Sequence, residues 1–355
     1  MRQEIFRMER VTYAEQGVRK LENFNIQIYV GEVMGLIPVN AHGKNAILKL
    51  LQNNLALFDG YIYYSGELVN SWRGAVKRSN RVSIIQAKNR LVNGMTVADN
   101  IFVLRQGFRQ YFLQMSLLNR ELAPFMQDIG MDISANTRVE NLSAFERVVV
   151  ELLRAVVGGY RLIVLDEISV FVSEKELRKL YQIMRHYTEQ GFSFLYISSH
   201  FEEIEHICDR TGFLCNGRLQ KILRKPDMNR KNLQECLEGY DRNVWGYPES
   251  GHLPKIGQEI GLEWEMFHDG EKRYFSFCIR EGECVTLQMH DNQILQNCVS
   301  FLTGEESRIV LDGRVRKIVS DREISVVSAA PTSTMIFPEM SYMDNLCMGL
   351  ARRMP

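Results

Sequence analysis

Apolar residues along the chain form short runs that predict alternating strands and helices. VMGLI at 33–37 is a continuous run of strand length, and AILKLLQNNLALF at 46–58 has the spacing of a helix with one apolar face. RLIVLDEIS at 161–169 places apolar residues directly before two acids, as in a buried strand that ends in carboxylates. The apolar run at 148–157 is interrupted by two charged residues, so we expect no segment of the printed sequence to span a membrane.

The sequence contains an imperfect internal repeat. FNIQIYVGEVMGL at 24–36 aligns without a gap on FSFCIREGECVTL at 275–287. Two further matches follow in the same order: the segment 60–66 with 308–313, and MTVADNI at 95–101 with MSYMDNL at 340–346. Matches that keep one order predict a duplicated domain. We expect a first domain at 1–220, a linker at 221–252 and an incomplete second copy at 253–355.

Charge balance and cysteine content narrow the class of protein. The sequence has 43 Lys and Arg against 43 Asp and Glu, and 45% apolar residues. A balanced charge gives no electrostatic reason for nucleic-acid binding, so we expect no nucleic-acid partner. The first residues are charged and lack an apolar signal segment, and the 7 cysteines form no C-x-x-C pair. We therefore expect a cytoplasmic protein with reduced thiols.

The loop PVNAHGKN at 38–45, between the first predicted strand and helix, has the context of a phosphate-binding loop. In such a loop, backbone N–H groups surround the β-phosphate and a lysine reaches the terminal phosphates. Gly43 and Lys44 fit the spacing G-x-x-x-x-G-K-[S/T], whereas Pro38 replaces the first glycine and Asn45 the hydroxyl residue. Because that hydroxyl normally ligates Mg²⁺, we expect the amide oxygen of Asn45 to weaken or rearrange metal binding.

Asp166 and Glu167 end the second predicted strand. The carboxyl ends of parallel strands form the edge of a sheet where ligands bind. In nucleotide hydrolases the first carboxylate holds Mg²⁺ through water, and the second can polarise the attacking water. Solvated acids at a strand end are the simpler interpretation, but together with Lys44 this pair predicts a nucleotide site.

These motifs resemble those of the ATP-binding subunits of ABC importers, in particular the tandem-cassette ATPases for ribose, galactose and similar sugars. NLSAFERVVVELLRAV at 141–156 is similar to the LSGGQ signature and its helix, and 166–219 is similar to the family from Walker B to the switch region. The resemblance covers nearly all of the chain. It implies an α/β fold of the P-loop NTPase class and ABC ATPase type: a mixed sheet with helices, a helical subdomain at about 100–157, and a partial second copy.

The resemblance also implies roles for individual residues. It implies that Glu167 and His200 are catalytic and that Asp166 and Asn45 hold the metal. The implied ATP contacts come from the phosphate loop, the Q-loop and, in trans, the signature of a facing cassette: Asn40, His42, Gly43, Lys44, Asn45, Ala46, Gln86 and Ser143. The implied cofactors are ATP and Mg²⁺. The implied partners are a transmembrane permease, which holds the protein at the inner face of the cell membrane, and a second cassette, either the same chain or a paralogue.

The signature departs from the family pattern. Its Gly-Gly-Gln is replaced by Ala144, Phe145 and Glu146. In the family one ATP lies between the phosphate loop of one cassette and the signature of the other. We therefore expect the bulk of Phe145 and the charge of Glu146 to hinder closure on the γ-phosphate.

Three further motifs depart from the pattern. The Q-loop glutamine aligns with Ala87, next to Gln86, and the switch histidine aligns with Ser199, next to His200. A shift of one residue would restore either residue, but in a strand such a shift turns the side chain to the opposite face. In the second copy, MHDNQILQ at 289–296 replaces the phosphate loop and contains neither glycine nor lysine.

The sequence leaves more than one function open. The first is an ATP-binding importer subunit that, if active, is an ABC-type ATP hydrolase with weak or partner-dependent turnover. Lys44, Asp166 and Glu167 support ATP binding. Loss of the hydroxyl that ligates Mg²⁺ and of the histidine that senses the γ-phosphate would raise the activation barrier for hydrolysis. The second is a non-catalytic ABC-like regulatory or interaction protein. A fragment or decaying gene product is a third interpretation of a second copy that stops short.

Overall fold

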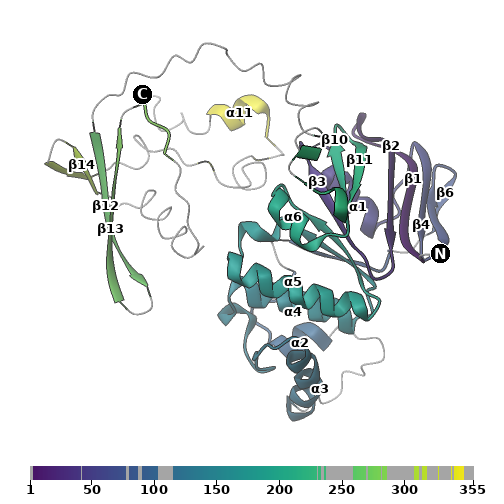
Figure 1. The fold of residues 1–355 in the computed structure, drawn as a ribbon, viewed down its shortest axis with the longest axis horizontal. Coiled ribbons are helices and arrows are strands. Elements are labelled where there is room, and N and C mark those ends of the chain that lie inside the picture. Colours follow the sequence, from purple (N-terminus) through teal and green to yellow (C-terminus); the bar gives the residue numbers. More distant parts are fainter. Residues whose placement is uncertain are drawn as a thin grey trace. The chain divides into compact units, whose positions relative to one another are not determined.

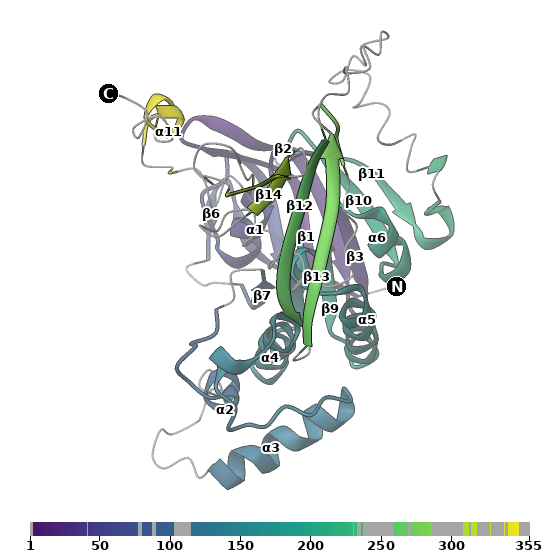
Figure 2. The same cartoon turned by 90° about the vertical axis from the view of Figure 1, so that its left-hand side faces the viewer.

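The computed structural model divides the chain into two units, residues 1–247 and 248–355. Figures 1 and 2 label the elements of each unit. The predicted positions Ala41 and Ala87 and the segment 289–296 lie outside the residues that the structure describes. The described residues are 3–40, 42–76, 80–86, 90–102, 115–229, 231–232, 236, 259–268, 271–280, 282–285, 308–311, 314–317, 327, 337 and 340–347.

A six-stranded mixed sheet forms the centre of the first unit. Its order is β11-β10-β3-β9-β8-β7, in which the strands from β10 to β7 are parallel and β11 is antiparallel to β10. All residues of β8 and β9 are buried, as expected for strands covered on both faces. The strands are β3 (Val33–Pro38), β7 (Val82–Ile85), β8 (Leu162–Asp166), β9 (Ser193–Ile197), β10 (Arg210–Cys215) and β11 (Arg218–Arg224). The predicted α/β class with a mixed sheet is therefore confirmed.

A second sheet of the same unit is antiparallel and has the order β2-β1-β4-β5-β6. Its strands are β1 (Glu4–Glu15), β2 (Val18–Tyr29), β4 (Asp59–Tyr64), β5 (Glu67–Ser71) and β6 (Gly74–Ala75). Phe24 and Ile28 of β2 share one apolar cluster with Met34 and Leu36 of the six-stranded sheet. The two sheets therefore enclose a common core.

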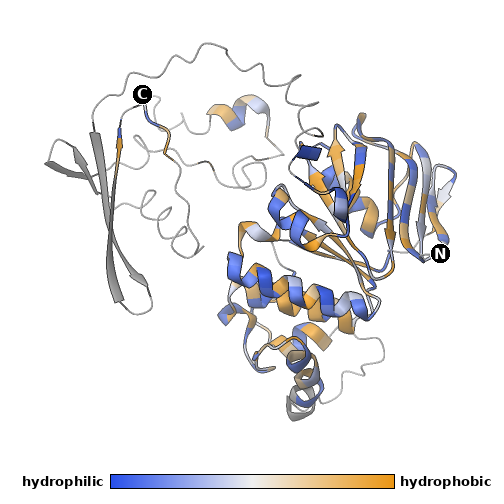
Figure 3. Ribbon diagram, viewed as in Figure 1, coloured by the Kyte–Doolittle hydropathy of each residue, from blue (hydrophilic) through white to orange (hydrophobic). Residues whose placement is uncertain are grey.

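Helices cover both faces of the six-stranded sheet (Figure 1). They are α1 (Lys44–Gln52), α2 (Val97–Phe102), α3 (Met115–Asp128), α4 (Ala144–Val157), α5 (Glu174–Glu189) and α6 (Phe201–Ile207), with 3₁₀ turns η1 (Val139–Asn141), η2 (Ile168–Val170) and η3 (Lys225–Asp227). Val33 and Ile37 of β3 join the cluster of α4 and α5, whereas Met34 and Leu36 join that of α1. Alternate residues of β3 thus fill opposite cores. The inner strands β3, β8 and β9 are mostly apolar (Figure 3). None of the helices in the described ranges is both long and apolar enough to cross a membrane.

Helix α1 is shorter than the helical stretch predicted at 46–58. It ends at Gln52, and Asn53 already has an extended backbone with φ −125° and ψ 142°. Leu57 lies beyond the helix but is buried in the same cluster as α1. The residues after the helix fill the same core as α1, so their apolar spacing continues that of the helix. For this reason the spacing predicts a helix that is longer than α1.

The second unit repeats the strand order of the first antiparallel sheet. Its strands have the order β13-β12-β14-β15, as β2-β1-β4-β5 do in the first unit. Arg280 pairs with Glu259 in the second unit as Tyr29 pairs with Glu4 in the first. The elements are β12 (Glu259–His268), β13 (Glu271–Arg280), β14 (Arg308–Leu311), β15 (Arg314–Lys317) and the helix α11 (Tyr342–Cys347). β11 and η3 occupy the first residues of the range 221–252 predicted as a linker, and the domain boundaries stay predictions.

Candidate functional site

The candidate site lies at the carboxyl edge of the six-stranded sheet, where β3, β8 and β9 end. The loop after β3 leads into α1 and carries Lys44, whereas β8 ends at Asp166. The residues after β9 include Ser199. Because β3 and β8 both pair with β9 in parallel, residues 122 positions apart in the sequence come together here.

Lys44 and Asp166 form an ion pair at this edge. Lys44 Nζ lies 2.9 Å from Asp166 Oδ1, and Gln86 Nε2 donates to Asp166 Oδ2 at 2.8 Å. The side chains of Lys44 and Asp166 are 21% and 6% exposed. Both carboxylate oxygens are therefore satisfied within the protein. The structure brings these three predicted residues together, and Gln86 itself reaches the site from the end of β7.

Glu167 stands beside this ion pair in a left-handed backbone conformation, with φ 53°. Its backbone N–H donates to the carbonyl of Ile197 at 2.9 Å, which fixes the turn after β8 against β9. The backbone N and the Oγ of Ser199 lie 3.5 and 3.4 Å from Glu167 Oε2. Burial raises the pKa of Glu167, and the charge of Lys44 partly opposes this rise. A carboxylate with a raised pKa is a stronger base once it is ionised.

Ser199, rather than His200, lies beside Glu167. His200 is exposed and precedes α6, and its backbone N–H donates to Ser198 Oγ at 3.0 Å. Its imidazole ring makes no hydrogen bond or ion pair with the residues that the structure describes. The alignment of the switch histidine with Ser199 therefore agrees with the geometry, and the predicted catalytic role of His200 gains no contact in its support.

The phosphate loop is fixed by polar contacts with a neighbouring turn. Asn40 Nδ2 donates to Asn216 Oδ1 at 2.7 Å, and the backbone N–H of Asn216 lies 3.3 Å from Asn40 Oδ1. The backbone N–H of His42 lies 3.3 Å from the same Asn40 oxygen. The Nε2 atom of the His42 ring is 3.0 Å from the carbonyl oxygen of Arg19. Gly43 has φ 93°, and a Cβ there would lie 3.0 Å from the Cα of Gly217. Glycine is therefore required at this position by backbone conformation and by space.

Asp166 and Asn45 are the residues predicted to hold Mg²⁺. Both carry oxygen donors, and Mg²⁺ commonly takes only one or two protein ligands besides phosphates and water. Asn45 is exposed in the first turn of α1, and the following Ala46 is buried in the core. The chemistry of both side chains therefore suits Mg²⁺, and Asp166 would have to release a hydrogen bond from Lys44 or Gln86 to take this role. Among the described residues no cluster of three or more His, Cys, Asp or Glu side chains could hold a metal ion.

The signature residues begin helix α4. Ser143 is its N-cap: Ser143 Oγ accepts from the backbone N–H of Glu146 at 3.2 Å, and Glu146 Oε2 accepts from that of Ser143 at 2.8 Å. Phe145 is buried in the core cluster beside α4. The expectation that the bulk of Phe145 faces another cassette is therefore wrong, because the ring packs inside its own unit. Glu146, likewise, is engaged in the helix cap.

Two charged residues of α4, to which no role could be assigned from the local pattern, hold the backbone of Arg90. Glu151 on α4 accepts a hydrogen bond from the backbone N–H of Arg90. Arg154, one turn later on the same helix, donates to the carbonyl of Arg90 at 3.0 Å. Glu151 Oε1 and Arg154 Nη2 are 3.6 Å apart. Burial raises the pKa of Glu151 and lowers that of Arg154. Two charges spaced one turn apart in the otherwise apolar run at 148–157 were the available signal.

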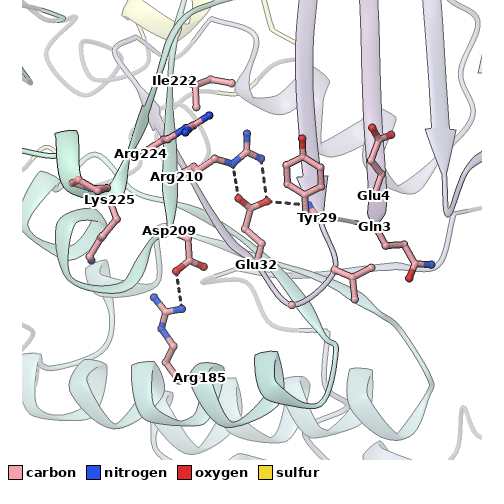
Figure 4. A pocket seen from close by; sticks show the side chains of 13 residues that line it. Gln3, Glu4, Tyr29, Glu32, Arg185, Asp209, Arg210, Ile222, Arg224 and Lys225 are labelled. Atoms are coloured by element: carbon pink, nitrogen blue, oxygen red, sulfur yellow. Dashed lines mark hydrogen bonds and ion pairs between the residues drawn. The ribbon is translucent and has the colours of Figure 1, made fainter. Parts of the chain in front are cut away.

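A large cavity lies at the opposite edge of the sheet, where β3 and β10 begin (Figure 4). It has a volume of about 1210 Å³. Arg210 Nη2 lies 3.0 Å from Glu32 Oε2, and Arg185 Nη1 lies 2.9 Å from Asp209 Oδ1. Asp209 also accepts from the backbone N–H of Val33 at 2.9 Å. These charged groups pair with one another and fix the start of β3. Because the cavity lies at the edge where the strands begin, it is distinct from the candidate site, which lies where they end.

Comparisons with known proteins agree with this geometry. Residues 21–170 match the family model described as ABC transporter. The ribose import ATP-binding protein RbsA of Caldanaerobacter subterraneus is 26% identical over 324 residues, which are 90% of this chain and 65% of that protein. The galactose/methyl galactoside import ATP-binding protein MglA of Clostridium perfringens is 26% identical over 281 residues, which are 79% of this chain and 54% of that protein. The chain thus spans about half to two thirds of these relatives.

The fold is also similar to solved structures. An ATP-binding cassette of an ABC transporter in its ADP conformation has a TM-score of 0.57 at 16% identity, covering 68% of this chain and 99% of that chain. A nucleotide-free cassette has a TM-score of 0.55 at 16% identity, covering 66% and 95%. The chain therefore contains an ABC transporter ATP-binding domain with the P-loop ABC ATPase fold, and it is homologous over most of its length to ribose and galactose import ATP-binding proteins.

Proposed function

We propose that residues 1–220 bind ATP with Mg²⁺ as the ATP-binding subunit of a carbohydrate importer, with weak or partner-dependent hydrolysis. The observation that carries this proposal is the contact of Lys44 Nζ with Asp166 Oδ1 at 2.9 Å, directly beside Glu167. One ammonium group and two carboxylates at one sheet edge suit a metal-bound triphosphate. The names of the relatives support sugar import.

The groups of the site have distinct tasks in this proposal. On binding, Lys44 leaves Asp166 and donates to the terminal phosphate oxygens, while the backbone N–H groups after Gly43 surround the β-phosphate. Asp166, once free, would hold Mg²⁺ through water, and the ion would supply positive charge against the phosphates. Glu167 accepts a proton from the attacking water. Its raised pKa suits this task.

Slow turnover follows from groups that this site lacks. Ser199 Oγ stands beside Glu167, where the family pattern has an imidazole that senses the γ-phosphate. Asn45 replaces the hydroxyl that normally ligates Mg²⁺. Electrostatic elements of this kind each contribute a few kcal/mol to barrier reduction, roughly 3 kcal/mol for one oxyanion-type donor. Binding survives such losses better than turnover does.

The proposal includes two protein partners. A permease would cross the membrane and hold this chain at the cytoplasmic face, and a second cassette would supply a signature in trans. Ser143 is the residue that would face the nucleotide of that cassette. Its Oγ is engaged in the cap of α4 at 3.2 Å, so its contact with a γ-phosphate competes with the cap.

Isothermal titration of ATP, with and without Mg²⁺, tests the proposal. The wild-type chain should bind with a dissociation constant between micromolar and millimolar, and Lys44→Ala should abolish the heat of binding. Lys49→Ala is the matched control, because Lys49 lies on the same helix but pairs with Glu15 at the surface. Absence of binding to the wild-type chain, or equal binding by Lys44→Ala, would contradict ATP binding at this site.

A non-catalytic regulatory or interaction protein is the second candidate function. Ser199 in place of the histidine favours it, as does the second copy without a phosphate loop. Phosphate release from ATP separates the two. Turnover that is measurable with a permease and lost in Glu167→Gln removes this candidate, whereas release at background level in both chains supports it.

A further inference from the structure

Glu203 on helix α6 fixes the turn that carries Ser199. Ser198 Oγ and the hydroxyl of Tyr196 both donate to Glu203 Oε2, each at 2.8 Å. Ser198 Oγ in turn accepts from the backbone N–H of His200 at 3.0 Å. Tyr196 and Ser198 are both 0% exposed. One carboxylate oxygen thus connects the end of β9 with the two residues that flank Ser199.

The contacts between Ser199 and Glu167 are too long to orient Ser199 by themselves. The backbone N and the Oγ of Ser199 lie 3.5 and 3.4 Å from Glu167 Oε2, near the outer limit of a hydrogen bond. Ser199 is also exposed, so packing in the core does not hold it. Its orientation therefore depends on its two neighbours in the chain, which are held through Ser198 Oγ.

Helix α6 gives Glu203 a fixed position. Two cations hold the far end of this helix: Arg185 donates to the carbonyl of Ile207, and Lys225 Nζ lies 2.9 Å from the carbonyl oxygen of His206. Cations stabilise the C-terminus of a helix. The apolar residues of α6 join the core cluster of α4 and α5. The carboxylate therefore stands on an element that is anchored independently of the turn.

We propose that Glu203 is a positioning residue for ATP hydrolysis. Through Ser198 it holds the N–H and the Oγ of Ser199 beside Glu167. Ser199 donates to Glu167 Oε2, which leaves the other oxygen, Oε1, to accept the proton of the attacking water. This inference rests on the proposed function, because it concerns the same reaction. Glu203 does not touch the nucleotide in this arrangement, and ATP binding through Lys44 is independent of it.

Hydrolysis of radiolabelled ATP with Mg²⁺ by an excess of the full chain tests this role, because single-turnover conditions detect a slow reaction. Glu203→Ala should lower the maximal rate constant at least about tenfold and change the half-saturating concentration less than about twofold. Glu203→Gln keeps an acceptor oxygen and should stay within about threefold of the wild-type rate. Glu202→Ala is the matched control, since Glu202 is the exposed neighbour on the same helix, and it should react as the wild type does.

Ser198→Ala separates positioning from a general effect on folding. It removes the group through which Glu203 acts, so it should lower the maximal rate constant about as much as Glu203→Ala. The double variant should be no slower than the slower single variant, because both changes interrupt one path of contacts. Losses that multiply in the double variant, or a wild-type rate in Ser198→Ala, overturn the proposal. Equal losses in Glu203→Gln and Glu203→Ala also overturn it, because the acceptor oxygen would then have no influence.

The variant Glu167→Gln distinguishes failure of this role from failure of the proposed function. Wild-type release of phosphate at background level, or release that Glu167→Gln leaves unchanged, contradicts hydrolysis at this site and overturns the role of Glu203 with it. Release that is lost in Glu167→Gln but kept in Glu203→Ala contradicts the role of Glu203 alone. Isothermal titration shows whether each variant still binds ATP, and a rate lost in Glu203→Ala only through weaker binding overturns the positioning role.

Discussion

The carboxylate of Glu151 accepts a hydrogen bond from the backbone N–H of Arg90, 61 positions earlier in the sequence. Glu151 lies on α4, the helix capped by Ser143 of the signature, and Arg90 follows the segment that begins with Gln86. Gln86 in turn donates to Asp166 at 2.8 Å. Contacts therefore link the carboxylate of the candidate site with the signature helix.

Replacing Glu151 by leucine should lower the free energy of unfolding by about 3 kcal/mol. The variant leaves the N–H of Arg90 without its acceptor and removes the carboxylate that lies 3.6 Å from Arg154, whose remaining acceptor among the described residues is the Arg90 carbonyl. Glu151→Gln keeps an acceptor oxygen and should cost only about 1 kcal/mol. Urea denaturation measures both values. Equal losses for the two variants would show that the acceptor oxygen contributes nothing.

The raised pKa of Glu151 predicts a specific dependence of stability on pH. Burial raises its pKa in the folded chain above the unfolded value of about 4.3. Between these two pKa values the folded state binds more protons than the unfolded state, so this group lowers stability as pH rises. Above the folded pKa its contribution is constant.

The measurement for Glu151 is the stability of wild type minus that of Glu151→Gln at a series of pH values. The difference should fall as pH rises from about 4.3 and then level off. The subtraction removes groups that titrate equally in both chains. A difference that rises through this range would mean that the folded protein lowers the pKa of Glu151 instead.

Gly217 should not tolerate a side chain. It has φ 74°, and a Cβ would lie 2.3 Å from the carbonyl oxygen of Lys20. Gly217→Ala should therefore cost more than the roughly 1 kcal/mol of left-handed strain. It should also weaken ATP binding, because the neighbouring Asn216 contacts Asn40 of the phosphate loop.

Gly66→Ala is the control for that variant. Gly66 has φ 83° with open space at the Cβ position, so only the strain of about 1 kcal/mol applies. Urea denaturation and isothermal titration are made on both variants. If Gly66→Ala lowers stability and ATP affinity as much as Gly217→Ala does, the close approach to Lys20 has no influence.

Local patterns predicted the elements and residues that follow the strand ends. The apolar run at 33–37 became β3, and the run at 162–165 became β8, which ends at Asp166 with Glu167 in the following turn. Lys44 and Asp166 were predictable because each follows a strand, and parallel neighbours end at one edge. The site could therefore be assembled from two short motifs.

Other features depend on tertiary packing and could not be derived in this way. The orientation of Phe145 is set by the start of α4 at Ser143, which turns the ring into the core. The contact of Glu151 with Arg90 joins residues with no shared local pattern. Helix α1 ends before its apolar spacing does, because extended residues can fill the same core.

Asn100 in α2 and Asn345 in α11 each bond the N–H and the carbonyl of a residue eight positions earlier, but their replacement should differ in its effect on stability. Asn100 is 4% exposed, and Asn100→Ala removes its hydrogen bonds to the N–H and the carbonyl of Val92 and to the carbonyl of Thr96, so the variant should cost about 2 to 3 kcal/mol. Asn345 is only half-buried, and water can replace its contacts with Phe337, so Asn345→Ala should cost about 1 kcal/mol or less. Hydrogen exchange read by mass spectrometry resolves each helix separately. Exchange should rise across α2 and its neighbours in the first variant but only near Phe337 in the second. A loss of protection that spreads through the second unit in Asn345→Ala would instead indicate that α11 is covered in solution.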